Sequence, residues 1–96
     1  MQEREFERRS ANLNAQLLLG DRSVACDICD ISLGGAMLRA ALPLGQGAAV
    51  TLSIDPYGRL AATAVWNRGD LSGLRFTDSS AHISEILAAV AIYSGA

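Results

Sequence analysis

The stretch that decides the fold of this chain is a short segment ending in paired glycines, Asp30-Ile31-Ser32-Leu33-Gly34-Gly35. Asp30 and Ile31 are also the last two residues of an alternating segment, residues 24–31 (VACDICDI). The period of two in this segment is typical of a β-strand with one buried face. Paired glycines reach backbone angles that other residues avoid, so we expect the strand to end at this point. Asp30 falls in the inward-facing register of the strand, close enough to its end to emerge at a rim.

Five further segments around this stretch have the same short, alternating character. In residues 12–19, for example, Leu13, Ala15, Leu17 and Leu19 lie at period two. Clusters of glycine, proline, aspartate and asparagine separate the segments and predict turns. Six short strands at even spacing are typical of an antiparallel β-barrel or sandwich. The other predicted strands are residues 36–41, 48–54, 59–66 and 71–77.

The last part of the chain has a helical period instead. Polar side chains that can cap a helix stand at residues 78–80, directly before the apolar positions Ile83, Ile86, Leu87 and Val90. The spacing predicts an amphipathic helix of about 12 residues whose apolar stripe packs on the barrel. The alternative use of the stripe is as a docking surface for another chain.

Composition limits the function classes. The chain has 96 residues, of which 50% are hydrophobic and 19% charged, as expected for one globular domain with its own core. A net charge of −2 and a pI of about 5.1 argue against a nucleic-acid-binding module, which usually has a basic face. No apolar run approaches the roughly 20 residues of a membrane span. Residues 1–9 lack the apolar stretch of a signal peptide, so we expect a cytoplasmic protein.

Cys26 and Cys29 form a C-x-x-C spacing that suggests redox or zinc chemistry. On a strand, residues three apart point to opposite faces, with Cα atoms roughly 10 Å apart and therefore beyond disulfide reach. The lone His82 cannot complete a four-ligand zinc site, and it lacks the partners of a catalytic triad. We therefore predict two structural thiols, no metal site and no enzymatic activity.

An arginine-rich segment precedes the first strand, Arg4-Glu5-Phe6-Glu7-Arg8-Arg9. Taken with the glycine-terminated stretch, it resembles the paired signatures R-x-x-x-R and D/N-x-S-x-x-G of PilZ domains. Residues 64–76 (AVWNRGDLSGLRF) are similar to the closing hairpin of that family. The resemblance implies a six-stranded antiparallel PilZ-type β-barrel over residues 12–96 with a C-terminal α-helix, preceded by a flexible arginine arm at residues 1–11.

The resemblance also implies a ligand, the second messenger cyclic di-GMP. Arginine forks match phosphate oxygens or the O6/N7 edge of guanine, and a carboxylate accepts hydrogen bonds from guanine N–H groups. Serine can donate to a phosphate, while glycine lets the backbone approach closely. The expected ligand-binding residues are Arg4, Arg8, Arg9, Asp30, Ser32, Gly34 and Gly35.

Each of these features has a structural alternative. Arg4 and Arg8 are spaced for ion pairs with neighbouring glutamates in a solvated helical turn. Asp30 and Ser32 can simply satisfy a turn, and the two glycines can form a bulge. Trp66 either stacks on a base or belongs to the core.

We therefore expect a receptor domain that passes the second-messenger level to a partner protein through ordering of its arm. No other cofactor is expected. The alternative is an interaction module of the same fold that has lost the nucleotide. Glu3, Glu5 and Glu7 favour that alternative, because they cancel the charge of the arm.

Overall fold

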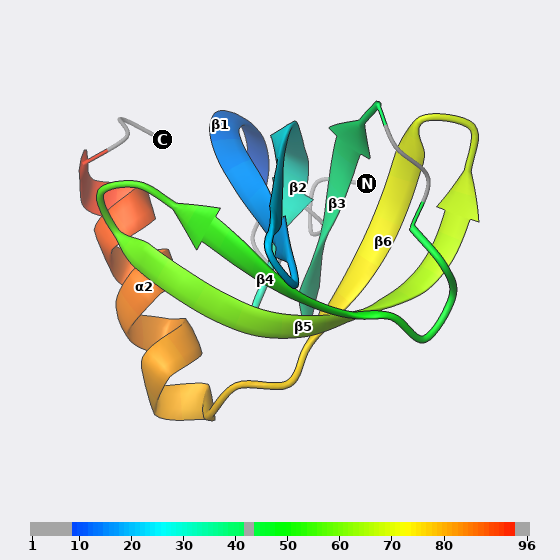
Figure 1. The fold of residues 1–96 in the computed structure, drawn as a ribbon. Helices are drawn as coiled ribbons and strands as arrows, with labels where there is room; N and C mark the ends of the chain where they lie inside the picture. The colour runs from blue at the N-terminus through cyan, green and yellow to red at the C-terminus, as the bar shows by residue number, and fades with distance from the viewer. Residues whose placement is uncertain (1–8, 42–43, 94–96) are drawn as a thin grey trace.

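The computed structural model of the chain describes residues 9–41 and 44–93, which form a six-stranded antiparallel barrel followed by a helix (Figure 1). The strand order around the closed barrel is β1-β2-β3-β6-β5-β4. The predicted fold class is confirmed. The strands are β1 (Arg9–Leu19), β2 (Arg22–Ile31), β3 (Gly35–Ala40), β4 (Ala49–Ile54), β5 (Gly58–Arg68) and β6 (Leu71–Phe76).

Hairpins make most of the barrel, and two longer-range pairings close it. Two of the hairpin turns contain a glycine in the left-handed region, Gly20 and Gly69, each with φ of 63°. β3 pairs with β6 across the intervening hairpin, and β1 pairs with β4 over residues 16–18 and 51–53. Because the barrel is closed, each strand has a hydrogen-bonded neighbour on both sides, which satisfies backbone N–H and C=O groups.

The core lies inside the barrel and is made of the alternating apolar residues. Inward-facing positions on neighbouring strands meet in register, such as Ile28 opposite Leu38, both 0% exposed. Each fully buried leucine or isoleucine contributes about 1.5–3 kcal/mol through removal of its side chain from water. The largest fully buried apolar side chains are Leu17, Ile28, Leu38, Leu52, Ile54, Leu60 and Val90.

Strand β1 begins at Arg9, whereas the alternation of the sequence predicted a start at Asn12. A register irregularity between Ser10 and Leu13 explains the difference, because it interrupts the period of two while the pairing with β2 continues. Residues 9–11, which were predicted to belong to the arm, are therefore part of the strand. Residues 1–8, with Arg4 and Arg8, lie outside the described residues.

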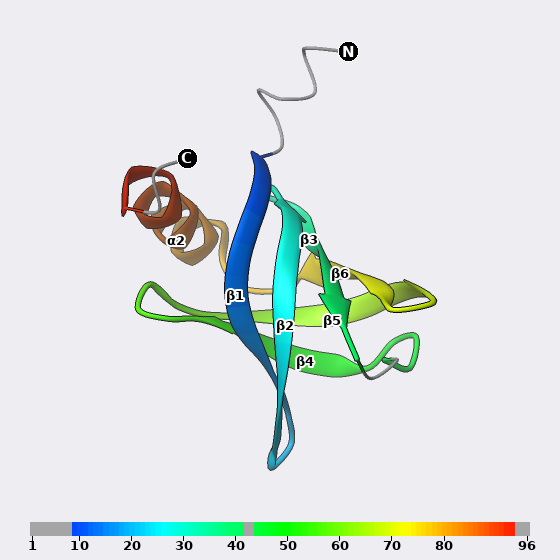
Figure 2. The ribbon, with the colours of Figure 1, turned by 90° about the horizontal axis from the view of Figure 1, so that it is seen from above.

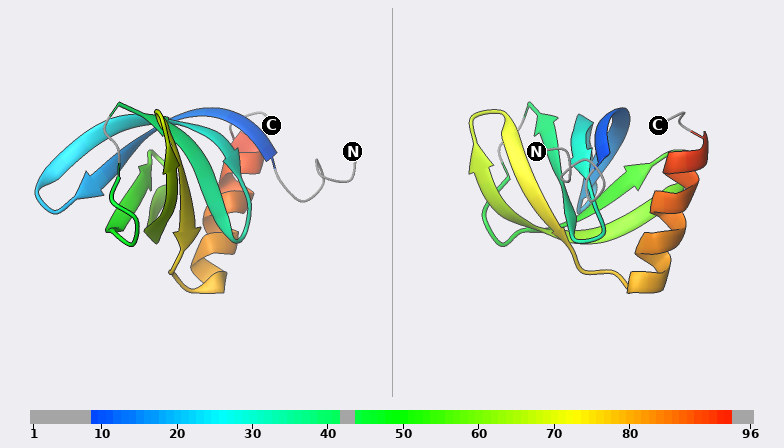
Figure 3. Two further views of the ribbon diagram at one scale, coloured as in Figure 1. Left: turned by 90° about the vertical axis from the view of Figure 1, so that its right-hand side faces the viewer. Right: turned by 180° about the vertical axis from the view of Figure 1, so that it is seen from behind.

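The helix α2 (Ser80–Tyr93) stands beside the barrel at the end of the β4–β5 hairpin (Figures 1 and 3). The Ser79 hydroxyl accepts a hydrogen bond from the His82 backbone N–H at 3.2 Å, which caps the helix as predicted. Ile83, Ile86 and Val90 are buried in the barrel's own core cluster. The apolar stripe of the helix therefore packs on the barrel and does not serve as a docking surface for another chain.

The connection between β6 and α2 is held by Asp78. Its carboxylate accepts hydrogen bonds from the backbone N–H groups of Ala61 and Ser79, each at 3.0 Å. These bonds, the one from Ala61 foremost, lower the pKa of Asp78 below its ordinary value of 3.8. His82 adds a second link, since its Nε2 lies 2.8 Å from the Arg59 carbonyl oxygen. The helix is thus tied to β5 at its first turn.

Candidate functional site

A β-bulge in β2 determines where Asp30 points. The register of β2 against β3 shifts between Ile28 and Asp30, so Cys29 is an extra residue in the ladder. After the shift, Ile31 faces the core and is 3% exposed, while Asp30 pairs with Met37 on the outer face. The predicted inward register of Asp30 is therefore wrong. A bulge moves every later side chain to the opposite face, and alternation read from the sequence does not reveal it.

The register places four residues in one row across four strands. Asp30 on β2 is opposite Met37 on β3, Met37 is opposite Gly73 on β6, and Gly73 is opposite Trp66 on β5. Directly opposite residues project from the same face of a sheet. Neighbouring strands lie about 4.8 Å apart, so the row from Asp30 to Trp66 runs for roughly 14 Å along the curved surface of the barrel.

The stretch between β2 and β3 is a tight turn stabilised by its own backbone. The Ser32 N–H donates to the Gly35 carbonyl at 2.9 Å, and the Gly34 N–H donates to the Ser32 hydroxyl oxygen at 3.3 Å. The Gly34 carbonyl in turn accepts from Phe76 N–H at 3.0 Å, which ties the turn to the end of β6. Ser32 therefore has the turn role that the sequence allowed.

Gly35 is required by the close approach of β3 to β6. A Cβ atom at this position would lie within 3.0 Å of the Leu74 carbonyl oxygen, closer than real Cβ atoms approach. This carbonyl belongs to the backbone of β6, so it cannot rotate away as a side chain could. Gly34, by contrast, has open space where its Cβ would be. The two glycines of the motif therefore have different roles.

Trp66 lies against Gly73 on the outer face of the barrel. A Cβ atom at Gly73 would lie within 3.0 Å of three atoms of the indole ring, so the ring covers the bare glycine backbone. Trp66 remains 40% exposed, which excludes the interpretation of this residue as core. Its ring extends across the row, from β5 over β6.

These parts line one cleft of about 270 Å³, which we call the motif cleft. It brings together four predicted site residues, Asp30, Ser32, Gly34 and Gly35. Sequence reasoning did not assign Met37, Val65 or Arg75 to the site, although Arg75 stands in the G-L-R-F stretch that signalled the closing hairpin. The lining residues are Asp30, Ile31, Ser32, Gly34, Gly35, Ala36, Met37, Val65, Trp66, Gly73, Leu74 and Arg75.

The remaining predicted site residues are the three arginines of the N-terminal segment. The backbone of Arg9 pairs with Ile31, and Ser10 pairs with Asp30. The chain therefore enters the barrel beside the motif. Arg4 and Arg8 lie outside the described residues, so their predicted contacts with a ligand stay a prediction.

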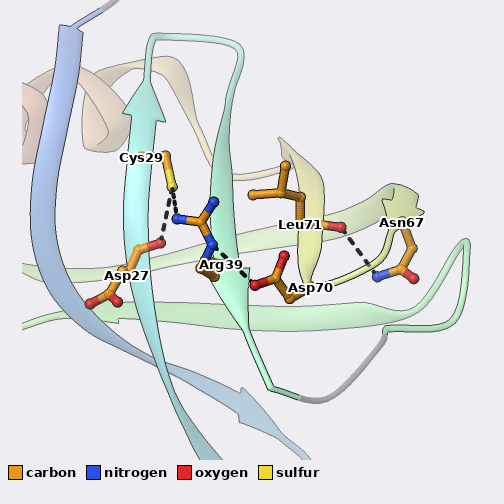
Figure 4. A network of polar contacts seen from close by, with 6 residues as sticks. All are labelled: Asp27, Cys29, Arg39, Asn67, Asp70 and Leu71. Atoms are coloured by element: carbon orange, nitrogen blue, oxygen red, sulfur yellow. Dashed lines mark hydrogen bonds and ion pairs between the residues drawn. The ribbon is translucent and has the colours of Figure 1, made fainter.

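The two cysteines are free thiols on opposite sides of the barrel wall, as the strand interpretation predicted. Cys26 is buried, and that burial, with the nearby charge of Asp27, raises the pKa of its thiol to about 11. It stays protonated at neutral pH and is a poor nucleophile. Cys29, the bulge residue, lies 3.8 Å from a guanidinium nitrogen of Arg39, which also forms an ion pair with Asp70 at 3.1 Å (Figure 4).

Within residues 9–41 and 44–93, no group of three or more His, Cys, Asp or Glu side chains is arranged to hold a metal ion. No helix in the same ranges has the length and apolar character that crossing a membrane requires.

Comparison with known proteins agrees with the architecture. The model of the PilZ domain family matches residues 2–91. Among solved structures, the PilZ domain of CeSA from a cellulose-synthesizing bacterium superposes with a TM-score of 0.69 at 19% identity, covering 86% of this chain and 93% of that chain. An uncharacterized Legionella protein superposes with a TM-score of 0.59 at 17% identity, covering 92% and 95%. No curated protein matches the chain.

Proposed function

The chain belongs to the PilZ domain family, and on that premise we propose that it is a non-enzymatic receptor domain that binds cyclic di-GMP in the motif cleft. PilZ domains are in general cyclic di-GMP receptors. The observation that carries the proposal is that one cleft contains the motif residues Asp30 and Ser32 together with Trp66 and Arg75.

Each of these side chains offers a contact that suits a guanine nucleotide. The Asp30 carboxylate accepts from the N1 and N2 donors of guanine. The exposed face of Trp66 supplies a stacking surface, worth about 1–3 kcal/mol for a base. Arg75 carries a planar fork that fits a phosphate or the O6/N7 edge of guanine.

The size of the cleft indicates how much of the ligand it holds. Its volume of about 270 Å³ lies below the roughly 300–1,000 Å³ of pockets that enclose a whole ligand. It fits one guanine group of a cyclic dinucleotide, and the phosphates and the second guanine need further partners. The arginine arm supplies them: Arg9 enters the barrel beside the motif, and Arg8 is covalently joined to it.

Signal transmission follows from this division of the ligand between barrel and arm. In the proposal, cyclic di-GMP orders residues 1–8 over the cleft and so changes the surface offered to a downstream protein. The barrel itself changes little, because its strands are paired on both sides.

Calorimetric titration of the full chain with cyclic di-GMP tests the proposal, with cyclic di-AMP as the control ligand. We expect micromolar or tighter binding of the guanine ligand alone. Asp30→Ala should weaken that affinity roughly 10- to 100-fold, because hydrogen bonds to a charged group contribute about 1.5–3 kcal/mol. Arg8→Ala should weaken it as well.

Asp27→Ala is the matched control, since Asp27 lies on the same strand but does not line the motif cleft. It should leave the affinity unchanged. Full affinity in both Asp30→Ala and Arg8→Ala would overturn the proposed site.

A second candidate function is a protein-interaction module that does not bind the nucleotide. The acidic residues Glu3, Glu5 and Glu7 favour it, because they offset the positive charge that would attract a dianionic ligand. Absence of heat and of any thermal shift with cyclic di-GMP, in a correctly folded chain, would select this function.

A further inference from the structure

Among the described residues that line the motif cleft, Arg75 alone carries a positive charge. It lies on β6 between Leu74 and Phe76, which are buried, while its own side chain is exposed. It follows Gly73 by two positions, so the two residues belong to the same outer face of the sheet. The Arg75 fork fits either a phosphate or the O6/N7 edge of guanine, and its surroundings favour the guanine edge.

The guanidinium of Arg75 forms no ion pair or hydrogen bond with another described residue. Arg39, on the neighbouring strand β3, is different because it pairs with Asp70 at 3.1 Å (Figure 4). Arg39 lines a second hollow, of about 740 Å³, which shares no lining residue with the motif cleft. We call it the acidic hollow, since its lining includes the carboxylates of Asp27, Asp55 and Asp70. The donors of Arg75 are therefore available to a ligand in the motif cleft.

Gly35 leaves the space between Arg75 and the motif free of side chains. It stands directly opposite Arg75 on the neighbouring strand β3. Asp30 lies two strands away from Arg75 and two residues along the sheet, which corresponds to about 10 Å and about 7 Å. A flat base fits between the two side chains, with hydrogen bonds of about 2.9 Å at each edge.

We propose that Arg75 is a specificity-determining residue that binds the O6/N7 edge of the guanine whose N1 and N2 donors are bound by Asp30. This assignment rests on the proposed function. N7 and N2 lie on opposite sides of the guanine ring system, so a base held by Asp30 presents its O6/N7 edge towards β6. Adenine has an amino donor in place of O6, which faces the donors of Arg75 unfavourably. Asp30 and Arg75 together therefore select guanine.

Calorimetric titration of the full chain with cyclic di-GMP tests this assignment. Arg75→Ala should weaken the affinity roughly tenfold, as expected for the loss of a bidentate contact with a base. Arg75→Lys should weaken it to a similar extent, because lysine keeps the charge but lacks the planar fork. The matched control is Arg59→Ala, which removes an exposed arginine of β5 outside the cleft and should bind like the wild type.

An analogue of cyclic di-GMP that contains 7-deazaguanine separates contact with the base from contact with a phosphate. The analogue has C–H in place of N7, so the O6/N7 edge loses one acceptor. It should bind the wild type severalfold more weakly than cyclic di-GMP does. In Arg75→Ala this ratio should be much smaller, because the contact is already absent. Contacts of the arm with the second guanine affect both proteins alike and cancel from the comparison.

The outcomes distinguish this assignment from the proposed function. Full affinity in Arg75→Ala, wild-type affinity in Arg75→Lys, or equal ratios for the analogue in the wild type and Arg75→Ala would overturn the role of Arg75. Each of these results leaves cyclic di-GMP binding by the wild type intact. Absence of cyclic di-GMP binding by the wild type would instead overturn the proposed function, and the role of Arg75 with it.

Discussion

The motif cleft and the acidic hollow share strands β2 and β3 but are built in different ways. The cleft depends on backbone geometry: Gly35 allows β3 to approach β6, and Gly73 leaves space for the Trp66 ring. The hollow depends on side chains, with exposed carboxylates above small residues such as Ala15 and Ala40. Arg39 lines the hollow, where it contacts the bulge residue Cys29 and pairs with Asp70.

This difference indicates how each region responds to sequence change. A substitution that fills the space of a cleft glycine collides with atoms of the sheet itself, so shape and stability change together. A substitution of an exposed carboxylate in the hollow alters charge at little cost in stability. The shape of the cleft is therefore linked to the stability of the fold, whereas the charge of the hollow can vary independently of it. Figure 2 shows the shared strands, β2 and β3, side by side along the barrel wall.

The largest effect is expected for Gly35→Ala. The new methyl group would collide with the Leu74 carbonyl, so β3 and β6 must separate, at a cost of about 1–3 kcal/mol or more in the free energy of unfolding. Urea denaturation measures that cost. Cyclic di-GMP affinity should fall with it, because the same separation opens the motif cleft.

Gly34→Ala is the matched control for this prediction. Its Cβ meets nothing within 4 Å, and its φ is not in the left-handed region. The variant should therefore remain within about 0.5 kcal/mol of the wild type. Equal destabilisation by the two variants would contradict the assigned role of Gly35.

A smaller effect is expected for Gly73→Ala. The obstacle here is a side chain, so the Trp66 ring can swing outward at a cost of roughly 1 kcal/mol. The ring then meets more water, and tryptophan fluorescence emission should shift to longer wavelength. In a Trp66→Ala background the substitution should cost much less, because the colliding ring is absent. Additive effects of the two changes would show that the ring and the glycine are not coupled.

The smallest effect is expected from a pair of carboxylates, Asp78→Asn and Asp55→Asn. Asp78 accepts two backbone hydrogen bonds that lower its pKa, whereas Asp55 accepts none from the described residues. A lowered pKa in the folded state stabilises the protein above the unfolded value near 3.8, and this contribution is lost as pH falls through the folded value. Asp78→Asn should therefore lower the melting temperature at pH 7, and its difference from the wild type should shrink towards pH 2.

Asp55→Asn makes the same change in charge at a carboxylate without those bonds, so its melting curve should follow that of the wild type from pH 7 to pH 2. Thermal scans across that range compare the two variants. A pH-independent deficit in Asp78→Asn would show that its carboxylate charge is not what the backbone bonds recognise.

Much of the fold could be predicted from local patterns. The period of two in Leu13 to Leu19 and the helical spacing of Ile83, Ile86 and Val90 each reflect burial of one face, which is encoded within a few residues. The beginning of β1 and the orientation of Asp30 were predicted wrongly. Both errors come from register shifts, which depend on the partner strand and leave no local periodic signal.

The candidate site, like the fold, could be predicted from the sequence only in part. Asp30, Ser32, Gly34 and Gly35 are contiguous enough to be recognised as one motif, and the structure brings them to one cleft. Arg75 was not assigned to that cleft. Trp66 had two interpretations in the sequence, core or stacking surface, because a strand pattern does not show whether a large aromatic residue is covered. In the structure its ring lies over Gly73, on the neighbouring strand, and is partly exposed.

The sequence by itself determined the six strands, the terminal helix and the motif, since each depends on periodicity, turn chemistry or capping within a short window. Only the tertiary structure decided which residues share a surface. The row from Asp30 to Trp66 and the lining of the acidic hollow, from Asn14 to Asp70, join positions that are far apart in the chain. Barrel closure sets those neighbours through the pairing of whole strands, a property that no single segment carries.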